Sequence, residues 1–236
     1  MKILKFDEFI NENVQKLIIN SKDELQNEIE RIIDTTQPDE GDTINLNHLD
    51  VSRVKDMSYL FGGYDYDFCN YDFDISNWDV SNVRNMTGMF ESCWCFNGDL
   101  SKWDVSNVRN MKHMFADCLE FNGDNISKWD VSHVEDMSYM FQYCQLFDCD
   151  LSNWDVSNVK DMRYMFADCE EFNSDLSNWD VSNVNNMKYM FYNCKSFKSN
   201  LDNWDIRNIK DEKSIHGMFR GSLHRTPSWY HDQYEY

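Results

Sequence analysis

Eight cysteines are the side chains with the most versatile chemistry in this 236-residue chain. Five of them follow successive tryptophans at a distance of 15 residues: Cys93, Cys118, Cys144, Cys169 and Cys194. Zinc needs convergent ligands, such as paired Cys-x-x-Cys knuckles, and Cys93-Trp94-Cys95 is not that pattern. Disulfides need an oxidising compartment. We therefore expect small, buried, free thiols and neither a metal nor a cofactor.

Aspartates also recur in two series. One series follows the tryptophans and the other precedes the segment that contains them. The first comprises Asp50, Asp79, Asp104, Asp130, Asp155, Asp180 and Asp205, and the second Asp74, Asp99, Asp124, Asp150 and Asp175. Carboxylates stacked about 5 Å apart in water repel by roughly 0.8 kcal/mol per pair, and we expect hydrogen bonds to nearby turn amides to offset this. Calcium between the repeats is the alternative, although the Gly-rich calcium nonapeptide is absent.

The chain has no motif that is typical of a catalytic site. It lacks a Gly-rich phosphate loop, a nucleophile elbow and an HExxH pair, and its six histidines share no spacing. We therefore predict that it is not an enzyme. The formal net charge of −20 argues against direct binding to nucleic acid, and the lack of a long apolar run argues against a membrane span.

Tyrosines and basic residues fall at the variable positions of the repeat, where a repeat protein can encode specificity. Aromatic residues and arginine are favoured anchors of protein interfaces. We predict that an unknown protein partner contacts Tyr139, Tyr164, Tyr189, Arg163, Lys188 and Lys160. The alternative is a solvated helix face with balanced charge.

The elements that position these residues follow from a period of 25 residues. Trp78, Trp103, Trp129, Trp154, Trp179 and Trp204 are separated by 25, 26, 25, 25 and 25 residues. Within each unit, apolar residues at offsets 0, 3, 6, 7 and 10 from Val83 predict a helix, and Leu100–Val105 predicts a short strand around Trp103. The fold class is therefore expected to be α/β: a leucine-rich-repeat-like solenoid of about seven coils.

The repeated text has a specific resemblance. Trp-Asp-Val-Ser-Asn-Val-x-x-Met-x-x-Met-Phe-x-x-Cys-x-x-Phe-Asn resembles the bacterial surface-protein repeat of BspA-like leucine-rich-repeat proteins and mycoplasma lipoproteins, over residues 49 to 220. The resemblance implies a solenoid that acts through protein–protein contact, often in adhesion, without catalytic residues. The chain shows neither the secretion signal nor the lipobox that usually accompanies this repeat.

The two ends do not repeat. Helical spacing predicts a first helix over Phe6–Ile18, and Ser21-Lys22-Asp23-Glu24 predicts a second helix whose apolar face is Leu25, Ile29, Ile32 and Ile33. A first strand is expected at 43–46. We divide the chain into a helical N-terminal cap (1–42), a repeat solenoid (43–222) and a C-terminal cap or tail (223–236). The first dozen residues are similar to short N-terminal segments, including head-targeting peptides, of proteins from large tailed phages.

Together these patterns predict a non-enzymatic protein-interaction module in a cytoplasmic or virion setting, monomeric and without a signal peptide. Two other functions stay open. An acidic rod could mimic nucleic acid and inhibit a host DNA-handling protein, or the chain could be a structural protein of a virion or cell surface.

Overall fold

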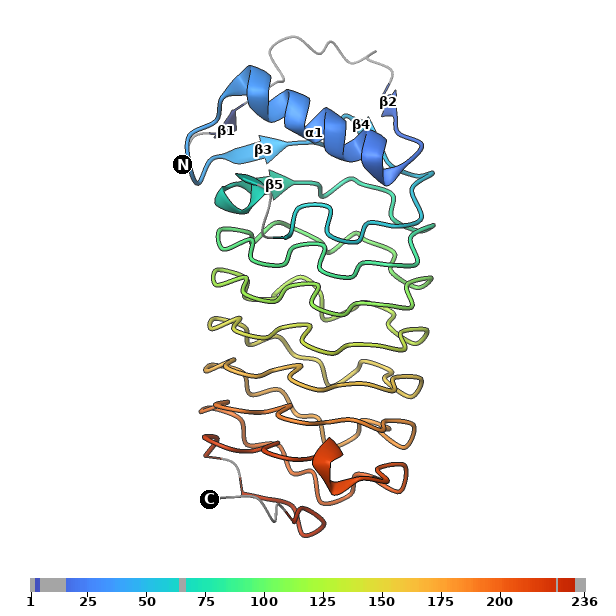
Figure 1. Cartoon of the computed structure of the whole chain (residues 1–236), viewed down its shortest axis with the longest axis vertical. Coiled ribbons are helices and arrows are strands. Elements are labelled where there is room, and N and C mark those ends of the chain that lie inside the picture. Colours follow the sequence, from blue (N-terminus) through green and yellow to red (C-terminus); the bar gives the residue numbers. More distant parts are fainter. Residues whose placement is uncertain (1–2, 5–15, 64–66, 224, 232–236) are drawn as a thin grey trace.

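The computed structural model describes residues 3–4, 16–63, 67–223 and 225–231. Figure 1 shows a column of stacked coils, with the helix α1 (Lys22–Thr36) lying across its N-terminal end. The strands β1 (Ile3–Leu4), β3 (Thr43–Asn45) and β5 (Asp72–Asp74) form a parallel sheet in the order β1-β3-β5. A second parallel sheet pairs β2 (Leu17–Ile18) with β4 (Leu49–Asp50). Two short 3-10 helices are η2 (Asp67–Asn70) and η3 (Glu212–Ser214).

Helix α1 begins where the sequence predicts. The hydroxyl of Ser21 accepts a hydrogen bond from the Glu24 amide (3.2 Å), and the Glu24 carboxylate accepts one from the Asn20 amide (2.8 Å). The first bond satisfies an amide that the first helical turn leaves without a partner, and the second ties the residue before the N-cap to the helix. Leu25, Ile29 and Ile32 are buried against the first coil, so the predicted apolar face is confirmed for these residues. The expected strand is confirmed over Thr43–Asn45.

The predicted first helix does not reach its expected end. Leu17 and Ile18 form β2 instead, and the Leu17 amide donates to the carbonyl of His48 (3.1 Å). Pairing with β4 requires extended backbone, and both apolar side chains are left exposed. Residues 5–15, which hold most of this prediction, lie outside the described residues.

Backbone hydrogen bonds join each coil to the next in register. In the coil that begins at Val83, alternate residues donate their amides to the following coil. The donors are Met86, Gly88, Phe90 and Ser92, and the acceptors are Asn110, Lys112, Met114 and Ala116, at 2.8–2.9 Å. Parallel bridges run through the same position of six coils: Asp56, Asn85, Asn110, Asp136, Asp161 and Asn186. This register places equivalent side chains of successive coils directly above one another.

The helix predicted in each coil is wrong. Between residues 75 and 211, all of which are described, the structure contains no helix. The segment after Val83 instead makes two successive turns, in which Met89 donates to the carbonyl of Met86 (3.2 Å) and Cys93 to that of Phe90 (2.9 Å). The third residue of each turn has a left-handed backbone, with φ of 58° at Gly88 and 65° at Ser92. This is the pattern of type II turns.

Two such turns imitate the periodicity of a helix. Each turn spans four residues and buries its first and last side chains, so apolar residues fall at offsets 0, 3, 4 and 7 from Met86. A helix buries the same offsets along one face. The four side chains, Met86, Met89, Phe90 and Cys93, are fully buried, so the sequence identified the inward residues while the backbone that carries them is different.

The predicted strand around each tryptophan is also replaced by turns. Trp103 donates its amide to the carbonyl of Leu100 (3.1 Å), and Val108 donates to that of Val105 (2.9 Å). Trp103 and Val105 nevertheless both face inward, as the alternation required. The indole Nε1 of Trp103 donates to the carbonyl of Ile75 in the preceding coil (3.1 Å). A buried indole needs such a partner, and the backbone of the neighbouring coil supplies it.

The tryptophan series extends beyond the last copy that was recognised in the sequence. The indole of Trp229, 25 residues after Trp204, donates to the carbonyl of Leu201 (2.8 Å), as Trp204 does to that of Leu176 (2.9 Å). The segment assigned to a C-terminal cap or tail thus contributes a further member of this series.

Aromatic columns fill the interior. Seven phenylalanines stack along the axis with ring centroids 5.4–5.8 Å apart: Phe61, Phe90, Phe115, Phe141, Phe166, Phe191 and Phe219. A second column passes beside it, so that Phe90 also stacks on Phe96 at 4.0 Å. No coil can bury these rings alone, so each depends on its neighbours for its core.

Candidate protein-binding face

The predicted partner-binding tyrosines come together in one stacked series. The ring of Tyr164 lies between those of Tyr139 and Tyr189, with centroid distances of 4.8 and 4.9 Å. His113 extends the series, 4.4 Å from Tyr139. Each residue occupies the third position of the first turn in its coil, rather than the exposed side of a helix as predicted. Because the rings cover one another's faces, they are partly exposed and present their edges to solvent.

These tyrosines occupy a backbone conformation that favours glycine. Tyr139, Tyr164 and Tyr189 have φ of 62°, 56° and 55°, whereas other coils carry Gly88 and Gly217 at the same position. A left-handed residue other than glycine costs on the order of 1 kcal/mol. The turn therefore forms without tyrosine, and the reason for these side chains lies in the contacts that their rings make.

Two of the three predicted cations lie over this series. The guanidinium of Arg163 is 5.8 Å from the ring centroid of Tyr139, and the ammonium of Lys188 is 5.4 Å from that of Tyr189. A cation over a tyrosine face is attracted by the ring quadrupole. Arg163 also lies 3.4 Å from a carboxylate oxygen of Asp161, which holds the guanidinium in place.

Lys160 is the predicted residue that the structure does not bring to the tyrosines. It belongs to a different position of the repeat, and its ammonium pairs with Glu135 at 2.5 Å. Arg109 pairs with the same carboxylate from the other side, at 3.3 Å. Glu135 thus pairs with both cations and offsets one of their two charges.

Two further tyrosines belong to this surface and were missed in the sequence. Tyr143 occupies the left-handed position of the second turn, with φ of 61°, and is 42% exposed. The carboxylate of Asp168, followed by burial, raises the pKa of its hydroxyl. Tyr192 meets Tyr189 edge to face at 5.7 Å. The four-residue spacing from Tyr139 to Tyr143, one turn to the next, was the available signal. We call Tyr139, Tyr143, Tyr164, Tyr189 and Tyr192 the tyrosine face.

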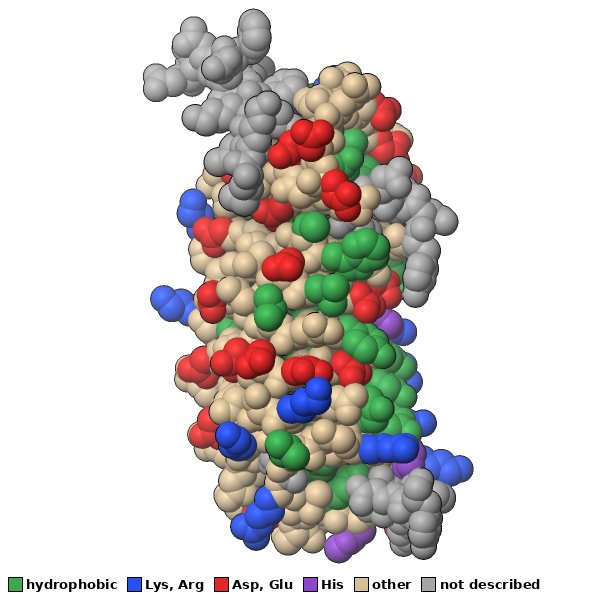
Figure 2. Space-filling view, turned by 90° about the vertical axis from the view of Figure 1, so that its left-hand side faces the viewer, with side chains coloured by type: hydrophobic (Ala, Val, Ile, Leu, Met, Phe, Trp, Pro, Cys, Tyr) green, Lys and Arg blue, Asp and Glu red, His purple; other side chains and the backbone are tan. Residues whose placement is uncertain are grey.

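Seen from the side, this surface forms a strip along the column. Figure 2 shows hydrophobic side chains descending one margin of the view, with basic and histidine side chains beside them. The rest of the visible surface carries many acidic side chains. A partner that approaches the tyrosine face therefore meets aromatic edges and cations on an otherwise acidic body.

The aspartate series serves the turns, as expected. Asp104 accepts hydrogen bonds from the amide and hydroxyl of Ser106, at 3.0 and 2.6 Å. Asp99 accepts one from the amide of Ser101 (2.9 Å), and its hydrogen bonds with Ser101 lower the pKa of its carboxyl. Local donors thus offset the repulsion between successive carboxylates. No three metal-ligating side chains converge on a common point anywhere in the described part of the chain.

The recurring cysteines are buried and bonded to the neighbouring coil. The thiol of Cys144 donates to the carbonyl of Phe115 (2.9 Å), and that of Cys169 to Phe141 (2.9 Å). Burial raises the pKa of both thiols, which keeps them protonated as donors. The expected small, buried, free thiols are confirmed at these positions.

The repeat matches a known family over most of the chain. The family described as "Mycoplasma protein of unknown function, DUF285" matches residues 28–125 and 120–229. The chain belongs to this DUF285 family. The resemblance to the mycoplasma repeat is therefore confirmed, whereas the narrower BspA-like leucine-rich-repeat assignment stays a prediction. No curated protein and no solved structure matches the chain.

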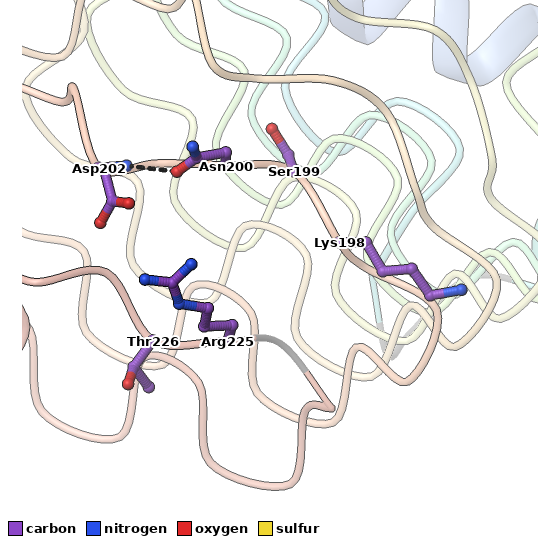
Figure 3. A pocket seen from close by; sticks show the side chains of 6 residues that line it. All are labelled: Lys198, Ser199, Asn200, Asp202, Arg225 and Thr226. Atoms are coloured by element: carbon purple, nitrogen blue, oxygen red, sulfur yellow. Dashed lines mark hydrogen bonds between the residues drawn. The ribbon is translucent and has the colours of Figure 1, made fainter.

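The hollows on this DUF285 protein are shallow. One of about 190 Å³ lies at the C-terminal end of the column, where Asp202 and Arg225 face each other beside Asn200 and Thr226 (Figure 3). Asn200 accepts a hydrogen bond from the Asp202 amide (3.0 Å), so it serves the turn rather than a ligand. Among the helices of the described residues, none has the length and apolar character needed to cross a bilayer.

Proposed function

We propose that this DUF285 protein is a non-enzymatic protein-interaction module, a solenoid whose tyrosine face receives the partner. The observation that carries the proposal is the tyrosine at the left-handed turn position of three consecutive coils, where Gly88 and Gly217 show that the turn needs no side chain. Strained backbone retained across neighbouring units favours a functional explanation over a structural one.

The chemistry of the face supports protein binding. Tyrosine offers a large rigid surface with two rotatable bonds and a hydroxyl, so it loses little conformational entropy when it is buried in an interface. Arg163 and Lys188 add cations that lie over the rings of Tyr139 and Tyr189. Preorganised groups of this kind gain affinity because little ordering remains to be done on binding.

A nucleic-acid-mimicking inhibitor is the runner-up, and the regular aspartate series is the observation behind it. Those carboxylates already accept hydrogen bonds within their own turns, as Asp104 and Asp130 do from Ser106 and Ser132. We therefore rank this function second. A structural role in a virion or at a cell surface, and a cytoplasmic location, remain proposals of the same kind.

The test is removal of one ring without strain. Tyr164→Gly deletes the central ring of the face at a position with φ of 56°, which glycine adopts readily. We expect the purified partner, first recovered by affinity capture from the native cell, to bind this variant at least about tenfold more weakly than wild type.

Tyr59→Gly is the matched control. Tyr59 occupies the same turn position in the first coil, with φ of 52° and 41% exposure, but lies outside the stacked series. Its loss should leave affinity unchanged. Equal binding by Tyr164→Gly and wild type would refute the tyrosine face as the binding surface. Competition by DNA, with affinity that collapses as salt rises, would support the mimic instead.

A further inference from the structure

A second exposed surface follows the tyrosine face along the chain, since Leu146 comes three residues after Tyr143. Trp94, Leu119 and Leu146 are 50%, 39% and 49% exposed, which is unusual for large apolar side chains in a chain with so complete a core. They come from three successive coils. We call these three residues the apolar corner.

The fold brings the corner together at one turn of the repeat. Trp94 and Cys95 are the central residues of the turn that Phe96 closes on the carbonyl of Cys93 (3.1 Å). In the next two coils, Leu119 and Leu146 lie between the equivalent cysteine and phenylalanine. The amide of Glu120 donates to the carbonyl of Trp94 (3.1 Å), which holds adjacent turns side by side.

The turn itself does not require apolar residues. In the two coils after that of Leu146, the same positions carry Glu170-Glu171 and then Lys195-Ser196, and the turn-to-turn hydrogen bond from Ser196 to Glu170 is retained at 3.1 Å. Apolar side chains are confined to three adjacent coils. Packing within the chain therefore does not account for them.

Exposed carboxylates lie at this corner. Glu120 follows Leu119 in the same turn and is bonded to Trp94, and Glu170 and Glu171 occupy the same turn in the coil after Leu146. The charges of Glu40 and Glu120, after burial, also raise the pKa of the Cys95 thiol. Figure 2 shows hydrophobic side chains among acidic ones over the upper and middle coils of this side. On the face turned to the viewer, lysines and arginines gather toward the C-terminal end instead.

We propose that the apolar corner is a second docking site, which receives a basic amphipathic segment of a partner protein. Apolar side chains of that segment would cover Trp94, Leu119 and Leu146, while its lysines or arginines would meet Glu40 and Glu120. The complementarity of charge selects this occupant, because nucleic acid, an anionic membrane and a second copy of a chain with net charge −20 are all repelled by the same carboxylates. The site goes beyond the function proposed above and does not depend on it.

The probe is a fluorescein-labelled helical peptide with leucines along one face and lysines along the other. We expect the intact protein to bind it in an anisotropy titration, and to bind the counterpart with glutamates in place of the lysines roughly tenfold more weakly or not at all. The double variant Trp94→Ala/Leu146→Ala should lose about tenfold in affinity for the lysine peptide. Both side chains are about half exposed, so the variant should keep the melting temperature of wild type.

The matched control is Leu223→Ala, which shortens an apolar side chain that is 82% exposed in the last coil. It should bind the lysine peptide as wild type does, and so should Tyr164→Gly. A double variant that binds like wild type would overturn the proposal, because net charge alone would then explain the affinity. Absence of binding by wild type would overturn it as well, and neither result would bear on the tyrosine face.

Discussion

At the scale of single residues, the surroundings shift the pKa of two aspartates, Asp99 and Asp161, in opposite directions. Asp99 is exposed, and its hydrogen bonds with Ser101 lower the pKa of its carboxyl. Asp161 lies in the series of parallel bridges that joins the coils and is largely buried. Burial raises the pKa of its carboxyl despite the nearby Arg163. Equivalent coils carry Asn85, Asn110 or Asn186 in place of Asp161. The charge at this position is therefore not needed for the fold.

Asp161→Asn should stabilise the protein at neutral pH. A raised pKa in the folded state means that the ionised carboxylate opposes folding above its ordinary pKa of 3.8, and that the penalty disappears once both states are protonated. We expect the free energy of unfolding to rise at about pH 7 and to match wild type at about pH 3. Denaturant titrations at the two pH values give both numbers.

Asp99→Asn is the control of opposite sign. Its lowered pKa stabilises the folded state above the ordinary value of 3.8, and that contribution is lost as pH falls through the folded pKa. This variant should lose stability at about pH 7, and the loss should shrink as pH falls below 3.8. Identical pH profiles for the two variants would contradict both assignments.

At the scale of elements, the sequence identifies the inward residues but not the backbone that carries them. Met86 and Phe90, which start successive turns, repeat at a spacing that a helix shares, so hydrophobic periodicity alone cannot separate the two. The distinguishing signal is a left-handed residue at the third position of each turn, and among the described turns glycine marks it only at Gly88, Gly217 and Gly221. A tyrosine at that position gives no sign of the turn in the sequence, because tyrosine usually avoids the left-handed conformation.

The candidate site was predictable to a similar degree. Tyr139, Tyr164 and Tyr189 could be aligned from the 25-residue period, and so could the Trp229 that the division of the chain overlooked. The pairing of Lys160 with Glu135 could not be predicted, because it depends on which side chains of neighbouring coils reach each other.

Gly217→Ala should be more damaging than its conformation alone would suggest. Its φ is 62°, and an added Cβ would lie 2.1 Å from the Tyr189 ring. Strain and displacement of the ring together should lower the free energy of unfolding by about 2–3 kcal/mol. Gly41→Ala is the control, because φ is 81° there but nothing lies within 4 Å, and it should cost about 1 kcal/mol. Equal losses in denaturant unfolding would show that the ring is not packed on this glycine.

At the scale of the whole molecule, the contacts between coils all depend on the register of the backbone hydrogen bonds between successive coils. Equivalent residues stack because each coil donates to the next at the same positions, and the coil with one extra residue keeps that register. Its inserted Asn125 bonds to Leu100 and Gly98 of the preceding coil (3.2 and 3.1 Å). The same column thus supports a tyrosine face and an apolar corner with opposite chemistry.

Removal of one whole repeat should therefore be tolerated. Deletion of Asp155–Trp179 joins Trp154 to Asp180 and restores the text of the repeat. We expect a folded protein whose free energy of unfolding depends less steeply on denaturant concentration, because a shorter column exposes less surface on unfolding. Tryptophan fluorescence during denaturant titration measures this.

Deletion of Val156–Trp179 is the control. It leaves one surplus aspartate between a tryptophan and its valine, which displaces every inward side chain that follows. This variant should lose the cooperative transition. Cooperative unfolding by the second variant would show that register is not required.

Three recurrent side-chain bonds between coils run in the same direction. The indole of Trp103 reaches back to Ile75, the thiol of Cys118 to Phe90, and the amide of Asn107 to Ser81. Each of these acceptors precedes its donor in the chain, and α1 covers the end from which the column starts. During synthesis, a coil that leaves the ribosome finds the acceptors for these side chains already in place. Its backbone amides, such as that of Met86, donate instead to the coil that follows, so the core of each coil is complete only after its successor has been made.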